Sequence, residues 1–275
     1  TAALVGDSAN LAEAERWLRK AREEHPRSTD VPRVDILVQQ QRVLESGGWD
    51  VSALRAALAR AHALHADAAY IASGRAVLAA YSGDPTAPAM LEQAVSQVQG
   101  EAALLYVIGR LQQRLGQSEA QARLLAARSA APDLIAAALA VAETQANQGQ
   151  ESDALETIEA VLKRHPKHLR ARLWRSLFTA DAQAPDAALA DLDGMAPEVR
   201  AAAPVDRILA AVARARILRR TGTGDTAVDA LRAAVDPHAG DRIFHHVAVA
   251  AVQLHACIND AALTLGEPIL RHGGG

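Results

Sequence analysis

The amino-acid sequence predicts an all-α protein built from stacked helical hairpins, and three observations support this prediction. Half of the 275 residues are hydrophobic but only 3% are aromatic. Most of the apolar residues are alanine and leucine, which are strong helix formers. A short apolar pattern recurs at intervals of 33 to 40 residues. Glycine and proline mark the breaks between the predicted helices.

The recurring pattern is a small or aliphatic residue, an apolar residue four positions later, and a small or apolar residue three positions after that. These spacings place the three side chains on one face of a helix. Along the chain the eight copies are Ala14, Leu18 and Ala21; Leu54, Leu58 and Ala61; Ala87, Leu91 and Ala94; Ala120, Leu124 and Ala127; Ala154, Ile158 and Val161; Ala188, Leu192 and Met195; Ala227, Leu231 and Ala234; and Ala261, Leu265 and Pro268. A period of about 34 residues is typical of hairpins that each pack on the next.

Two kinds of break separate the predicted helices. A turn precedes each copy of the pattern from the second onward, and glycine suits the left-handed conformation that ends a helix; most of these turns contain one, at Gly47–Gly48, Gly83, Gly116, Gly149, Gly222 and Gly224. Proline, which cannot continue a helix, follows many of the copies, at Pro26, Pro132, Pro166, Pro197 and Pro237, with Gly100 after the third copy. Each unit therefore consists of a first helix, a glycine turn, a second helix that carries the pattern, and a break.

This pattern resembles the tetratricopeptide repeat (TPR) family. That family has a small residue at repeat position twenty, a large apolar residue at twenty-four, a small residue at twenty-seven and proline at thirty-two. Ala120, Leu124, Ala127 and Pro132 match these positions in register. The resemblance implies a right-handed superhelical α-solenoid. It implies one TPR-like domain over residues 1–275, with about seven complete hairpins after an N-terminal half repeat.

The first copy has a second helix but almost no residues before it that would form a first helix. We therefore expect Leu11, Trp17 and Leu18 to have one face partly uncovered. We also expect the chain to be a segment of a longer protein, with residues before Thr1.

Composition and motifs argue against several classes of function. The formal charge of −3 and the pI of about 6.3 give no global attraction for nucleic acid or anionic membranes. No apolar stretch is long enough to span a membrane. The single cysteine, Cys257, excludes an internal disulfide and a cysteine-rich zinc site. No phosphate loop, dinucleotide fingerprint or catalytic motif occurs, so we expect a non-enzyme without cofactors.

The histidine pairs leave two interpretations open. His62 with His65, His165 with His168, and His245 with His246 could each contribute to a zinc site if further ligands converged on them. The alternative is ordinary surface and helix-end histidines. It is favoured because a metal site needs three or four converging ligands.

The resemblance to TPR proteins implies a concave groove lined by first-helix positions. Its candidate partner-binding residues are Gln39, Leu139, Glu143, Arg170, Leu173, Leu177, Arg216, Arg219, His246 and Gln253, with Val43, Ala72 and Ala76 beside them. The alternative is that some of these residues are core residues in tight helix packing.

Two basic clusters give the groove a preferred partner chemistry. They contain Lys163, Arg164, Lys167, Arg170, Arg172 and Arg175, and then Arg207, Arg214, Arg216, Arg219 and Arg220. One interpretation is a site for an acidic peptide or an anionic polymer. The other is a solvated face that is balanced by Asp181, Asp186, Asp191 and Asp193.

The predicted function is non-catalytic protein–protein interaction, as a scaffold or adaptor that binds a peptide or helix of a partner in the groove. An acidic segment or an amphipathic helix suits the groove, and self-association is open. One alternative is a periplasmic scaffold of an envelope or exopolysaccharide export machine. Another is the sensor or effector part of a multidomain regulator. The composition favours a bacterial source, and leaves the cytoplasm and the periplasm open as its location.

Overall fold

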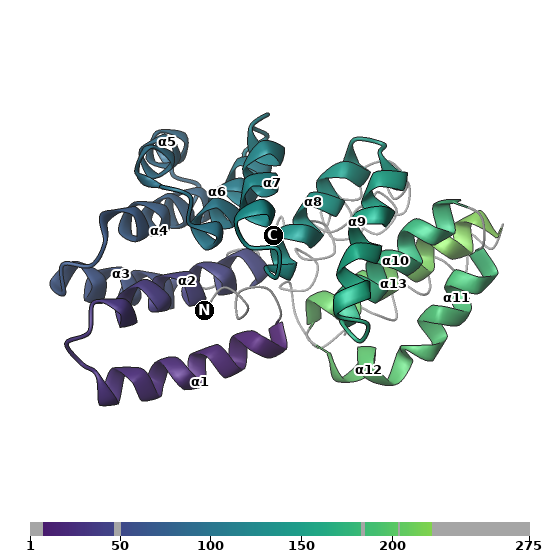
Figure 1. Cartoon of the computed structure of the whole chain (residues 1–275), viewed down its shortest axis with the longest axis horizontal. Coiled ribbons are helices and arrows are strands. Elements are labelled where there is room, and N and C mark those ends of the chain that lie inside the picture. Colours follow the sequence, from purple (N-terminus) through teal and green to yellow (C-terminus); the bar gives the residue numbers. More distant parts are fainter. Residues whose placement is uncertain (1–7, 47–50, 183–184, 203, 222–275) are drawn as a thin grey trace, which may run out of the picture. The chain divides into compact units, whose positions relative to one another are not determined.

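The computed structural model describes residues 8–46, 51–182, 185–202 and 204–221. Within these ranges every regular element is an α-helix, which confirms the predicted fold class. The chain divides into two compact units, Thr1–Val141 and Ala142–Gly275. Each unit is described by itself, and Figure 1 labels the helices of both. The superhelical hand and the count of seven hairpins in one domain stay predictions.

The first unit contains seven complete helices and the start of an eighth within its described residues. They are α1 (Ser8–Glu24), α2 (Asp30–Ser46), α3 (Ser52–Ala63), α4 (Ala68–Tyr81), α5 (Ala87–Gln97), α6 (Ala102–Arg114) and α7 (Ala120–Ala130), followed by α8 (Ile135–Asn147). The first helices of the hairpins are α2, α4 and α6, and the second helices are α3, α5 and α7. The α1 helix is the predicted N-terminal half repeat.

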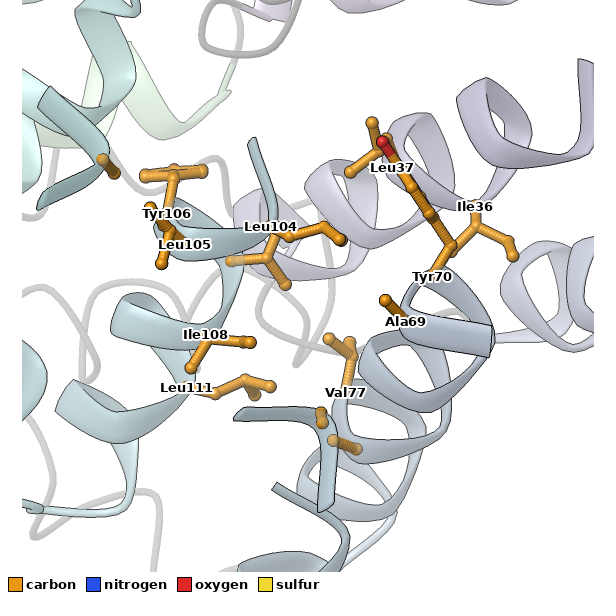
Figure 2. Close-up of a cluster of buried hydrophobic side chains, with 14 of the residues drawn as sticks. Ile36, Leu37, Ala69, Tyr70, Val77, Leu104, Leu105, Tyr106, Ile108 and Leu111 are labelled. Carbon is orange, nitrogen blue, oxygen red and sulfur yellow. The ribbon is translucent and has the colours of Figure 1, made fainter. Parts of the chain in front are cut away.

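Packing in the first unit repeats from hairpin to hairpin. Each helix from α1 to α6 contacts the next one along the chain, and the first helices α2, α4 and α6 also contact one another. Their apolar side chains form one core cluster, in which Ile108 and Leu111 of α6 point toward Val77 of α4 (Figure 2). The predicted stacking of hairpins is therefore present in this unit.

The recurring pattern forms the contact face of the second helices. Six of its eight copies lie in the part of the chain that the structure describes. In these copies every residue of the pattern is buried except Ala21, which is partly exposed. The copies that begin at Ala227 and Ala261 lie outside the described residues. For the six described copies, the prediction that the pattern marks a packed helix face is confirmed.

The glycine turns have the predicted conformation. Gly83, Gly116 and Gly149 have φ values of 68°, 68° and 75° and follow α4, α6 and α8. In each turn the next residue donates its backbone N–H to the carbonyl oxygen five residues earlier, as in a Schellman cap. Gly100 after α5 also has a positive φ, of 76°. Gly47, Gly48, Gly222 and Gly224 lie outside the described residues.

The second unit continues the alternation of helices with one addition. Its further helices are α9 (Glu151–Arg164), α10 (Leu169–Ala182), α11 (Pro185–Gly194), α12 (Ala196–Ala201) and α13 (Pro204–Arg220). Thr157 Oγ1 of α9 lies 3.0 Å from Gln145 Oε1 of α8, and α10 contacts α9, α11 and α13.

Pro26, Pro132 and Pro166 lie in turns directly after α1, α7 and α9, as predicted. Pro197 also follows a copy of the pattern but lies in the first turn of α12, a short helix that the sequence did not predict. This extra helix accounts for part of the longer interval between the copies at Ala188 and Ala227.

The N-terminal half repeat is packed on one side. Ala14 and Leu18 of α1 are buried against Val38 of α2, while Trp17 is 56% exposed. A buried carboxylate also ties α1 to the first hairpin. Asp35 of α2 lies 2.5 Å from Arg22 Nη2 of α1 and 2.7 Å from Arg60 Nη2 of α3. One acidic side chain on a first helix thus connects the second helices on either side of it along the chain.

Candidate partner-binding surface

The predicted groove residues are divided between the two units. Gln39 and Leu139 lie in the first unit, on α2 and α8. Glu143, Arg170, Leu173, Leu177 and Arg216 lie in the second, on α8, α10 and α13. The side chain of Arg219, and the whole of His246 and Gln253, lie outside the described residues. The predicted set therefore does not lie within one unit.

Apolar members of the set are core residues. Leu173 and Leu177 are 0% exposed on α10, and Leu139 is buried on α8. Val43 and Ala76, which the same register places in the groove, are also fully packed. These side chains present no surface to a partner in this conformation. The alternative of tight helix packing therefore describes them better than groove lining does.

Two polar members of the set, Gln39 and Glu143, are also buried. Gln39 is 6% exposed, and its Oε1 accepts no hydrogen bond within the described residues. Gln112 on α6 has the same property and lies at a groove position in the third complete copy of the register. The sequence interpretation missed Gln112, although the register that selected Gln39 also selects it. Since α2 and α6 are in contact, the first unit has amide groups with spare hydrogen-bonding capacity on adjoining first helices.

The basic clusters are largely balanced by acidic residues. Arg170 Nε of α10 lies 2.6 Å from Asp206 Oδ1 of α13, and this pair is nearly buried. Arg172 pairs with Glu198, Arg175 with Asp191, and Arg214 with Asp193. The structure thus favours the balanced face over an unpaired basic groove for these four arginines. Arg216 is partly exposed on α13.

The histidine pairs do not form a metal site in the described part of the chain. No group of three or more histidine, cysteine, aspartate or glutamate residues there is arranged to hold an ion. His168 Nδ1 instead accepts a hydrogen bond of 3.2 Å from the N–H of Ala171 in the first turn of α10. His245 and His246 lie outside the described residues. Of the helices that the structure describes, none combines the length and apolar character needed to cross a membrane.

Two tyrosines in the first unit have pKa values that burial raises above the ordinary value. Burial raises the pKa of Tyr70 on α4, and the hydrogen bond of its hydroxyl to Glu101 raises it further. Burial also raises the pKa of Tyr81, whose ring lies 4.2 Å from the guanidinium carbon of Arg114. Both phenols are held neutral between helices. We therefore assign them to packing.

The chain is similar to a solved structure at low sequence identity. No family model and no curated protein matches this chain. A solved structure described as "Crystal structure of YrrB: a TPR protein with an unusual peptide-binding site" matches with 21% sequence identity and a TM-score of 0.42. The match covers 78% of this chain and 97% of that one. The family named in that description is the one that the repeat pattern resembles.

Proposed function

We propose that this chain is a non-catalytic protein-interaction scaffold that binds a peptide or a helix of a partner along its first helices. The observation that carries the proposal is the burial of the repeated pattern in six successive second helices. The repeated residues serve to stack the hairpins. Stacks of this kind present extended surfaces for binding rather than enclosed reaction centres.

The unrepeated polar residues of the first helices are the proposed contact groups. Gln39 and Gln112 each have an amide oxygen that accepts no hydrogen bond within the described residues. A buried acceptor without a donor is unfavourable, so a ligand N–H that reaches it gains free energy. The terminal torsion of glutamine is broad, which lets the amide turn toward the exposed edge of its side chain. A peptide backbone supplies donors of this kind at regular intervals.

Arg216 is the proposed charged contact on the second unit. It lies on the first helix α13, and its side chain is partly exposed. An acidic residue of the partner is expected to interact with its guanidinium group.

The test is to capture the partner and then measure its affinity for purified variants by calorimetry. Gln39→Met removes the amide oxygen that is proposed to accept a hydrogen bond from the partner, and Arg216→Glu reverses a charge. Each is expected to weaken binding about tenfold, the effect of losing one charge-assisted or well-formed hydrogen bond. The matched control is Lys163→Glu, which reverses an exposed charge on the second helix α9. It should leave the affinity unchanged.

Two results would overturn the proposal. One is that the Lys163 variant lowers the affinity as much as the first-helix variants do, because binding would then not depend on the first helices. The other is full affinity in both first-helix variants, which would place the contact elsewhere. Far-ultraviolet circular dichroism of every variant checks that the helices are retained.

A further inference from the structure

A cleft in the first unit has the composition of a binding site. It has a volume of about 460 Å³ and lies between the C-terminal end of α3 and the helices α4 and α5. Its lining includes His62 and His65 from the end of α3, Arg75 and Ile71 from α4, and Met90 and Gln97 from α5. A volume in this range is typical of pockets that hold a small ligand or a few residues of a peptide.

The ionisable side chains that line the cleft are all basic. The lining contains an arginine and two histidines but no aspartate or glutamate. Within the described residues the side chains of Arg75, His62 and His65 make no hydrogen bond or ion pair. Arg60, which lies shortly before His62 in the sequence, is instead paired with Asp35. The cleft therefore presents the exposed guanidinium group of Arg75 beside two imidazoles, with no acidic side chain in its lining.

The backbone at His65 is a second unusual feature of the same cleft. His65 has a φ of 51° and lies in a Schellman cap, where the N–H of Ala66 donates to the carbonyl oxygen of Ala61. Glycine occupies this left-handed position in the caps after α4, α6 and α8. A non-glycine residue rarely adopts such a conformation, and strained residues of this type are concentrated at binding sites. The histidine is thus found on the rim of the cleft at a position that favours glycine.

The remaining groups of the cleft distinguish a peptide from a simple anion. Ile71 and Met90 provide apolar surface beside the cationic groups. Gln97 Oε1 is buried and accepts no hydrogen bond within the described residues, so it has capacity for a donor. An inorganic anion has neither an apolar part nor an N–H group, whereas a peptide segment has both.

We propose that this cleft binds a short acidic segment of a partner protein. A carboxylate of the segment pairs with Arg75 and with the imidazoles of His62 and His65. An adjacent apolar side chain packs on Ile71 and Met90, and a backbone N–H of the segment donates to Gln97 Oε1. Ile71 and Arg75 lie on the first helix α4, but none of the cleft residues is one of the contact groups of the proposed function, which are Gln39, Gln112 and Arg216. The two proposals can therefore fail independently.

The test is a selection of random octapeptides on the immobilised chain, followed by affinity measurements on the enriched peptides. Enrichment of aspartate or glutamate beside an apolar residue is expected. Arg75→Gln and His65→Asn are each expected to weaken the enriched peptides about tenfold, because each removes a charge-assisted hydrogen bond. Asparagine is chosen because it tolerates the left-handed backbone. The matched control, Arg55→Gln, removes an exposed arginine from α3 outside the cleft and should have no effect.

Three outcomes would overturn the proposal. They are the absence of any enriched peptide, enrichment without acidic residues, and acidic peptides whose affinity is unchanged by Arg75→Gln and His65→Asn. Replacing glutamate by glutamine in the enriched peptide shows how much of the affinity comes from the carboxylate and how much from the peptide backbone. A displacement experiment compares inorganic phosphate with free glutamate. If both displace the enriched peptide equally well, the cleft is a general anion site, and this result would also contradict the proposal.

Discussion

The first and second helices of the hairpins differ in how they use their residues. The second helices repeat a pattern of small and aliphatic residues, and that pattern is buried in every copy within the described part of the chain, apart from Ala21. The first helices have no such repeated pattern and carry buried polar residues, among them Asp35, Gln40, Gln112 and Ser73. The repeated residues of the second helices thus specify how the hairpins stack. The residues that differ from copy to copy lie on the first helices.

Polar contacts between successive copies join side chains that differ from one copy to the next. Gln40 Nε2 donates to Ser73 Oγ over 2.9 Å, and these residues lie 33 positions apart. Arg33 pairs with Asp67 at a separation of 34 residues, and Arg170 with Asp206 at a separation of 36. These spacings are close to the repeat period. Equivalent positions in neighbouring copies therefore carry different but complementary side chains.

The largest expected effect is on a buried alanine of a second helix. Ala154 of α9 is 0% exposed. Ala154→Arg places an unpaired charge between packed helices and should lower the free energy of unfolding by several kcal/mol. Urea unfolding followed by circular dichroism measures the loss. Ala160→Arg, at an exposed position of the same helix, should change it by less than about 0.5 kcal/mol. Similar losses in the two variants would contradict the assigned contact face.

A smaller effect is expected where a first helix approaches its second helix closely. A Cβ atom on Gly109 of α6 would lie 2.8 Å from both Cγ and Cδ2 of Leu124 on α7. Gly109→Ala should therefore cost about 1–3 kcal/mol through overpacking, although alanine is the better helix former. Gly194→Ala in α11 is the control, since nothing lies within 4 Å of its added Cβ. A Gly109 variant as stable as the wild type would show that the helices are farther apart than described.

The smallest effect concerns the polar contacts between first helices. Ser73→Ala leaves Gln40 Nε2 buried without its acceptor and should cost about 1 kcal/mol, at the lower end of the range for an unpaired buried donor. Replacing both partners, as Gln40→Leu with Ser73→Ala, should restore most of this loss because no buried polar group is then left unpaired. A double-mutant cycle from urea unfolding measures the coupling. Additive losses in the double variant would mean that the two side chains do not interact.

The sequence predicted the features that depend on local chemistry or on the repeat. A spacing of four and three residues identified the buried face of each second helix. Glycine identified the left-handed turns at Gly83, Gly116 and Gly149, because φ is a local property. His65 was missed, since histidine gives no comparable signal for a positive φ.

Features that depend on distant residues were not predictable from one sequence. The bridge from Asp35 to Arg22 and Arg60 joins three helices, and nothing in the local pattern marks these residues as partners. Burial of Leu173 and Leu177 depends on how closely the neighbouring helices pack, so register alone placed them in a groove. The pairing of the basic clusters had been weighed as an alternative, and the structure favours it for four arginines.

The most direct test of the account is an arginine scan of α7 from Ala120 to Ala130, with the midpoint of urea unfolding measured for each variant. The account predicts three large decreases, at Ala120, Leu124 and Ala127, which are the buried residues of this helix. Arginine at Ala122, Leu125 and Ala126 should leave the midpoint nearly unchanged, because these side chains are exposed. Decreases that are uniform along the helix, or largest at the exposed positions, would contradict the claim that the repeated pattern stacks the hairpins.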